Sequence, residues 1–131
     1  MDKRKRLLAY VYAVARAMRL GGWYFAILED EPSDGSVAEI RVGEEDKNAD
    51  ILFSSRFWDA SSDSKRQIVT HELLHCHTLH TMCAHWEAMR ANMSPNTFVT
   101  VKAVLVSLYE RDVDEIAEVL APHMPRYPAK N

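Results

Sequence analysis

Apolar side chains recur every three or four positions near the start of the chain. This spacing predicts a helix over residues 3–20 with one buried face. Gly21 and Gly22 interrupt the pattern, so we expect them to end the helix. A basic start before an apolar run is also typical of a signal peptide, but here the run is short and Arg16 and Arg19 continue the helical pattern. The apolar face comprises Leu7, Leu8, Val11, Val14 and Met18.

Three short segments with strand character follow the first helix. They cover residues 23–30, 37–42 and 49–54. The second segment alternates between apolar and polar side chains, which is typical of a half-buried strand. Because the connecting loops are short, we expect the three strands to form, at least in part, an antiparallel meander.

The second half of the chain predicts two helices and a tail. Polar residues 61–64 offer N-caps for a helix that runs over residues 65–80 or beyond. Ser94 as N-cap and Pro95 in the first turn mark the start of another helix, whose apolar pattern continues to position 120. Residues 122–131 are rich in proline, so we expect an extended tail.

Length and composition restrict the fold to one α+β domain over residues 1–131, with a helix, a small three-stranded sheet and two further helices. Apolar residues make up 47% and charged residues 27%, so the composition excludes a disordered chain. The net charge of −3 provides no positive field for nucleic acid or an anionic membrane, and we expect neither as a partner. Cys76 and Cys83 are too far apart on one helix for a disulfide, which suits a cytoplasmic protein. The oligomeric state is left open.

The most informative motif is HELLH at residues 71–75, inside the helix predicted from residue 65. Side chains four positions apart on a helix share one face, about 6 Å apart along the axis. Two imidazoles in that arrangement can bind one zinc ion. Glu72, between the two histidines, stays free to act as a general base toward water. The alternative interpretation is that both histidines are ordinary hydrogen-bonded residues.

A catalytic zinc ion needs a third protein ligand. The extended motif HExxHxxGxxH is excluded, because Thr78 and Thr81 replace its glycine and its third histidine. We favour Glu110 on the next helix as the third ligand. Asp114, one turn later, is then expected to accept the outer N–H of a ligand histidine. The competing interpretation is a solvated acidic face on this helix.

Three more side chains are candidates for the site. His80 or His85 could replace Glu110 as the third ligand, or could donate a hydrogen bond to the reacting carbonyl oxygen. Tyr109 is a weaker candidate for that hydrogen bond. Single histidines on a helix are more often surface residues without a metal.

These motifs resemble those of the zincin metallopeptidases. HELLH with Glu110 to Asp114 downstream is similar to the gluzincin arrangement, in which a glutamate of an ExxxD motif on a following helix is the third ligand. ERDVDEIAEVLAP (110–122) is similar to the glutamate helix of the ImmA/IrrE metallopeptidases, and residues 56–78 resemble small metallopeptidase-like proteins encoded by bacteriophages. The resemblance covers about half of the chain and implies a minimal zincin-like domain. The chain departs from the ImmA/IrrE pattern at Asp114, where that group usually has asparagine.

The sequence therefore predicts a zinc metallopeptidase with one zinc ion, held by His71, His75 and Glu110, and with Glu72 as the catalytic base. The resemblance further implies that residues 49–54 form a sheet edge that binds a peptide or protein substrate by strand addition. Two alternatives remain. One is a catalytically silent, zinc-stabilised binding module. The other is a SprT-like, DNA-associated protease with His85 as third ligand, which only the basic N-terminus favours.

Overall fold

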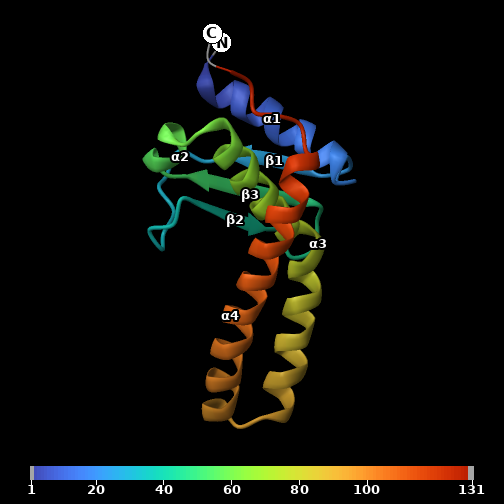
Figure 1. The fold of residues 1–131 in the computed structure, drawn as a ribbon. Coiled ribbons are helices and arrows are strands. Elements are labelled where there is room, and N and C mark those ends of the chain that lie inside the picture. The colour runs from blue at the N-terminus through green and yellow to red at the C-terminus, as the bar shows by residue number, and fades with distance from the viewer. Residues whose placement is uncertain (1, 130–131) are drawn as a thin grey trace.

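The computed structural model describes residues 2–129 and has the predicted α+β architecture (Figure 1). A long pair of helices, α3 and α4, extends away from a small sheet and a first helix. The predicted order of elements is confirmed, with one additional short helix between the sheet and α3. The elements are α1 (Lys3–Ala17), β1 (Tyr24–Ile27), β2 (Ala38–Val42), β3 (Asn48–Phe53), α2 (Ser55–Asp59), α3 (Ser62–Asn92), α4 (Pro95–Leu120) and the 3-10 turn η1 (Ala121–His123).

The sheet has the strand order β1-β3-β2, which confirms the expected antiparallel meander only in part and corrects the expected edge position of residues 49–54. Only β2 and β3 pair antiparallel, with Ile40 opposite Ile51, whereas β1 runs parallel to β3. The segment 49–54 is therefore in the central strand and not at a sheet edge, because β3 is hydrogen-bonded on both sides. The physical reason lies in its three consecutive buried apolar residues, Ile51 to Phe53, which are typical of a strand covered on both faces.

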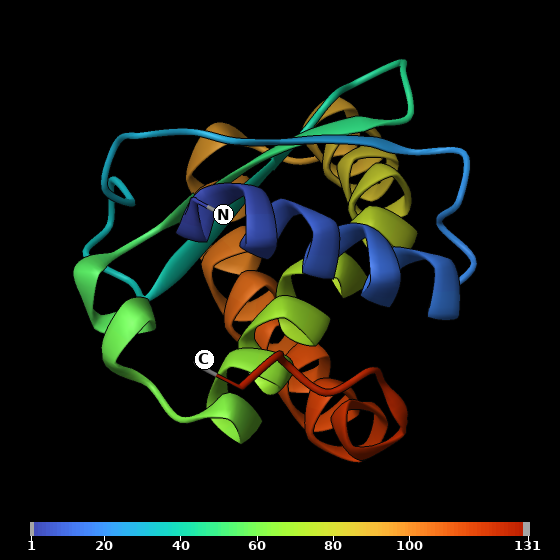
Figure 2. The same cartoon turned by 90° about the horizontal axis from the view of Figure 1, so that it is seen from above.

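The core lies where α1 and the first part of α3 meet the sheet. Figure 2 shows α1 lying across α3, with the strands beside it. Leu7 and Val11 of α1, Ile51 of β3, and Val69 and Leu73 of α3 are all fully buried. Full burial of such side chains contributes about 1.5–3 kcal/mol each to folding, so this core holds the first part of α3 firmly in place.

The end of α1 differs from the expectation based on the two glycines. The helix ends at Ala17, and Arg19 takes the left-handed conformation with φ 61°. The backbone N–H of Leu20 donates to the carbonyl of Ala15 at 2.7 Å, and that of Arg19 donates to Arg16. This pair of hydrogen bonds is a Schellman motif, and it satisfies the last carbonyls of the helix before the glycines are reached.

The two long helices begin where the polar caps predict. Ser61 accepts a hydrogen bond from the backbone of Ser64, and Ser94 accepts one from Thr97, with Pro95 in the first turn of α4. We call residues 62–80 and 109–120 the near half of this helical hairpin, and residues 81–92 and 95–108 its far half. Among the described residues, no helix has both the length and the apolarity needed to cross a membrane.

The C-terminal segment is partly as expected. After the turn η1 it is extended as far as residue 129, and positions 130 and 131 lie outside the described residues. It is not a free tail, because the hydroxyl of Tyr10 donates to the carbonyl of Pro125 at 2.8 Å. The ring of Tyr127 packs edge-on against Tyr10 at a centroid distance of 4.9 Å. The segment therefore covers one side of α1.

Candidate metal centre

Three side chains from α3 and α4 converge on one point. His71 and His75 are one turn apart on α3, and their ring centroids are 5.3 Å apart. Glu110 reaches them from α4, with its Oε2 3.5 Å from Nε2 of His71 and 3.6 Å from Nε2 of His75. The structure thus brings together the three ligands expected from the sequence, with their ligand atoms within 4.8 Å of one another.

The two distances from Glu110 fit a tetrahedral zinc ion. Two ligand atoms that each lie about 2.1 Å from zinc at a tetrahedral angle are about 3.4 Å apart. The carboxylate oxygen of Glu110 is close to that separation from both imidazole nitrogens. Two imidazoles and one carboxylate are also the donor set of known catalytic zinc sites. The two Glu110 distances and the donor set of the three residues therefore suit this metal.

The outer nitrogens of both histidines have hydrogen-bond partners. Nδ1 of His71 lies 3.2 Å from Oδ1 of Asp114, as the spacing on α4 predicts. A proton on that Nδ1 is donated to the carboxylate, which leaves the lone pair of Nε2 for a metal. Asp114 is thus placed to fix both the tautomer and the ring orientation of His71.

A chain of hydroxyls does the same for His75. Nδ1 of His75 lies 3.0 Å from the hydroxyl of Tyr109, which also hydrogen-bonds to Thr78. Thr78 in turn donates to the carbonyl of Leu74, so its own oxygen is left to accept the proton of Tyr109. Tyr109 can then accept only from His75, which places the ring proton on Nδ1 and directs Nε2 toward Glu110.

Glu72 is the remaining charged group of the motif. It is 8% exposed, and among the described residues it has no hydrogen-bond partner. Burial raises the pKa of its carboxyl, although the neighbouring His71 and His75 act in the opposite direction. In the metal-free site, where Nε2 of each histidine can carry a proton, hydrogen bonds from His71 and His75 lower the pKa of the Glu110 carboxyl to about 2, so Glu110 is a carboxylate near neutral pH. The two glutamates thus differ in environment, one paired with imidazoles and the other unpaired.

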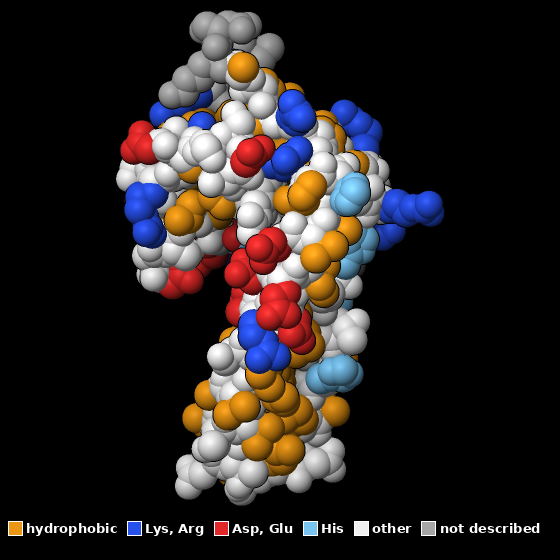
Figure 3. Space-filling model, in the orientation of Figure 1, with side chains coloured by type: hydrophobic (Ala, Val, Ile, Leu, Met, Phe, Trp, Pro, Cys, Tyr) orange, Lys and Arg blue, Asp and Glu red, His pale blue; other side chains and the backbone are white. Residues whose placement is uncertain are grey.

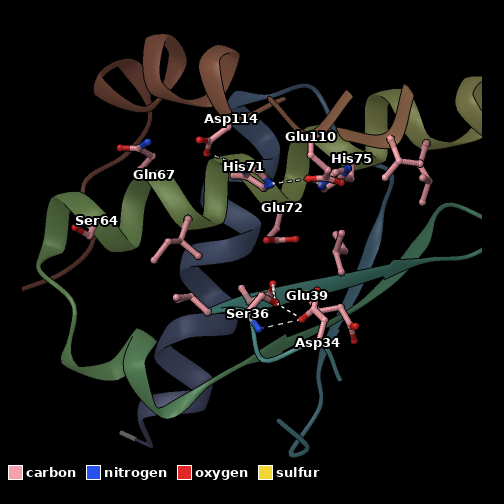
Figure 4. A pocket seen from close by; sticks show the side chains of 16 residues that line it. Asp34, Ser36, Glu39, Ser64, Gln67, His71, Glu72, His75, Glu110 and Asp114 are labelled. Carbon is pink, nitrogen blue, oxygen red and sulfur yellow. Dashed lines mark hydrogen bonds and ion pairs between the residues drawn. The ribbon is translucent and has the colours of Figure 1, made fainter. Parts of the chain in front are cut away.

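A cleft of about 780 Å³ opens beside the three ligands (Figure 4). Its walls are α3, the middle of α4, and β2 with the loop that precedes it. Glu72 projects into the cleft from α3, and Ser36 and Glu39 lie on the opposite wall. A metal held by the three ligands would therefore be open to the cleft and adjacent to the free carboxylate of Glu72.

The two other candidate histidines, His80 and His85, lie away from the three converging residues. Nε2 of His80 is hydrogen-bonded to the carbonyl of Gly43 at 2.6 Å, and its ring stacks on Trp23. His85 is exposed in the far half of the hairpin. Five residues after His75, a helical side chain has turned by about 140°, so His80 cannot point to the same side. Tyr109 was expected as a hydrogen-bond donor to substrate, but its hydroxyl supports His75 instead.

No pattern in the sequence indicates a role for Thr78. A threonine three residues after a ligand histidine and a tyrosine directly before the third ligand are weak signals, because only the helix pairing brings the two hydroxyls together. What the geometry offers chemically is a three-ligand site with one open side and an unpaired carboxylate next to it. No protein-family model, no curated protein and no solved structure matches this chain, so its function is inferred from the site itself.

Proposed function

We propose that the protein is a zinc-dependent metallopeptidase. The observation that carries the proposal is the convergence of His71, His75 and Glu110 on one point at the edge of a cleft, with Glu72 unpaired beside it. A merely structural site would need four protein ligands, whereas a catalytic one keeps an open position. The described residues group only three ligands at this point.

In the proposed reaction the three ligands and Glu72 have separate roles. His71, His75 and Glu110 hold the ion, and a bound zinc supplies an acidified water and a polarised carbonyl group. Glu72 accepts a proton from the attacking water and returns it to the leaving amine. Its buried position favours proton uptake, because burial raises the pKa of its carboxyl.

The outer residues keep the ligands in position. Asp114 and Tyr109 hold the rings of His71 and His75 so that both Nε2 atoms face Glu110. Such hydrogen bonds to the far side of a ligand imidazole raise its basicity and restrict its rotation.

In this proposal the substrate lies along β2 rather than along residues 49–54. β2 pairs with β3 on one side only, and its residues line the cleft opposite α3. The outer backbone groups of an edge strand can pair with an extended peptide. A peptide bound in this way would pass between Glu72 and the strand.

Metal analysis tests the ligand set. We expect one zinc ion per chain in the wild-type protein, and loss of that zinc in His75→Ala and Glu110→Ala. Glu72→Gln and His85→Ala should retain it, because neither residue is among the three converging ligands. Loss of zinc in His85→Ala with retention in Glu110→Ala would instead support the SprT-like arrangement.

Peptide cleavage tests the catalytic role. The wild-type protein with zinc should cleave members of a randomised octapeptide library, and Glu72→Gln should reduce the rate by about 100-fold or more. Zinc content must be equal in the two proteins for this comparison. If both bind zinc fully and neither cleaves any peptide, the protein is a silent, zinc-stabilised binding module and the proposal is wrong.

A further inference from the structure

The cleft has an unusual balance of charge. Its lining includes carboxylates from three parts of the chain but neither lysine nor arginine. Figure 3 shows acidic side chains gathered where the upper body of the molecule meets the projecting hairpin. A cleft lined by one sign of charge focuses the electric field and attracts ligands of the opposite sign. The five acidic residues in the lining are Asp34, Glu39, Glu72, Glu110 and Asp114.

A metal ion does not neutralise this cleft. Among these carboxylates, Glu39 is paired with Arg41, whose guanidinium lies 3.1 Å away. The two charges of a divalent ion and the single charge of Arg41 are fewer than the five carboxylates. Glu72 is more than nine-tenths buried, unpaired and directed into the cleft. A negative field thus remains when the metal site is filled.

Asp34 supplies this charge on the wall opposite the metal ligands. The backbone N–H and the hydroxyl of Ser36 donate to its Oδ1 at 3.0 and 2.6 Å, and among the described residues Oδ2 has no partner. These hydrogen bonds lower the pKa of the Asp34 carboxyl, so it is ionised near neutral pH. The loop is held in place by Arg56, which donates to the carbonyl of Gly35 at 2.5 Å.

The turn that presents Asp34 depends on the next residue. Gly35 has a φ of 74°, in the left-handed region that favours glycine. The position of Asp34 is therefore determined by backbone geometry and by two hydrogen bonds.

We propose that the cleft selects polypeptide substrates with a lysine or arginine side chain next to the cleaved bond, with Asp34 as a specificity-determining residue. This inference rests on the proposed peptidase function. A cationic side chain entering between Asp34 and the metal ligands gains from the free Oδ2 and from the surplus negative charge. An acidic side chain in the same place is repelled.

Cleavage of the octapeptide library provides the first test. Sequencing of the products should show lysine and arginine enriched at one position flanking the cut and aspartate and glutamate depleted there. In Asp34→Asn the amide oxygen can still accept the hydrogen bonds of Ser36, so the turn is kept while the charge is lost. The ratio of kcat/KM for a lysine peptide to that for its glutamine analogue should fall several-fold in this variant, and less at high salt.

Asp46→Asn is the matched control. Asp46 is also an exposed aspartate in a loop, but it does not line the cleft. The control should keep the wild-type preference for lysine. Cleavage with equal preference for lysine and glutamate would overturn the proposed selectivity while leaving the peptidase function intact.

A binding experiment separates the two proposals further. Zinc-loaded Glu72→Gln protein is titrated calorimetrically with octapeptides that alternate alanine with lysine, glutamine or glutamate. We expect the lysine peptide to bind at least ten-fold more tightly than the glutamate peptide, and Asp34→Asn to reduce that ratio. Such a result supports the selectivity even if no peptide is cleaved, whereas equal affinities would refute it.

Discussion

The near and far halves of the α3–α4 hairpin consist of the same two helices but differ in burial. In the near half, Val69 and Leu73 are fully buried and His75 is 7% exposed. In the far half, Val99 and Val104 are more than half exposed, although both are apolar. The near half is packed against the sheet and α1, whereas the far half consists of two helices with nothing else described beside them (Figure 1).

The difference in burial indicates that the candidate metal site owes its rigidity to packing against the sheet and α1. Two packed helices alone bury only a narrow seam, so a third layer is needed to enclose a core. The sheet and α1 provide that layer beside residues 71–75 of α3. Beyond them the layer is missing, since the last buried residue of α3 is Cys76. Local stability should therefore decrease along α3 from the site toward residue 92. The ligand histidines lie on the well-supported side of this boundary.

The largest expected effect comes from two leucine substitutions, one in each half of the hairpin. Leu73→Ala removes a fully buried side chain in the near half and should lower the free energy of unfolding by about 2–5 kcal/mol. Leu105→Ala, at a position 36% exposed in the far half, should lower it by about 1 kcal/mol or less. Urea unfolding of the metal-free proteins measures both. Equal losses would mean that the far half is buried in solution.

Zinc removal should affect the two halves differently. Binding of an ion to the folded state at 100 times its dissociation constant adds about 2.7 kcal/mol of stability. Because His71, His75 and Glu110 all lie in the near half, chelation should speed backbone hydrogen exchange there and leave residues 81–92 largely unchanged. Uniform acceleration along α3 would contradict the local placement of the site.

A smaller effect, confined to zinc affinity, is expected when the hydroxyl that supports His75 is removed. Tyr109→Phe removes the acceptor for Nδ1 of His75 and should weaken zinc binding by about 10- to 100-fold in competition with a chelator. Tyr24→Phe is the control, because the side chain of Tyr24 lies on β1, is 76% exposed and does not line the cleft. Unchanged affinity in Tyr109→Phe would show that Tyr109 does not orient the ligand.

The reactivity of the two cysteines tests the same boundary between the near and far halves, and it needs no substitution. Burial, with a further contribution from the charge of Glu72, raises the pKa of the Cys76 thiol to about 12. Cys76 is therefore protonated at pH 8 and should react slowly with a thiol reagent such as DTNB. Cys83, exposed in the far half, should react at once, so the native protein should show one fast thiol and the urea-unfolded protein two.

Expectations that rest on local spacing agree with the structure. The two histidines share a helix face because they are four residues apart, and the caps at Ser61 and Ser94 are set by neighbouring residues. Glu110 was predicted from its position on the next helix, and Asp114 from its spacing to Glu110. The positions of these side chains agree with the predictions because helix geometry converts a sequence interval directly into a direction, whereas their roles at a metal ion stay predictions.

Other features depend on contacts between distant segments. The parallel pairing that puts β3 in the centre of the sheet, the hydrogen bond of His80 to Gly43, and the link from Tyr109 to Thr78 all join residues far apart in the chain. The sequence by itself determined the helices, the motif and the residue types that could hold a metal. Only the tertiary structure decided which strand is free to meet a substrate and which groups hold the histidines, because such pairings are chosen by competing long-range packing and not by any local period.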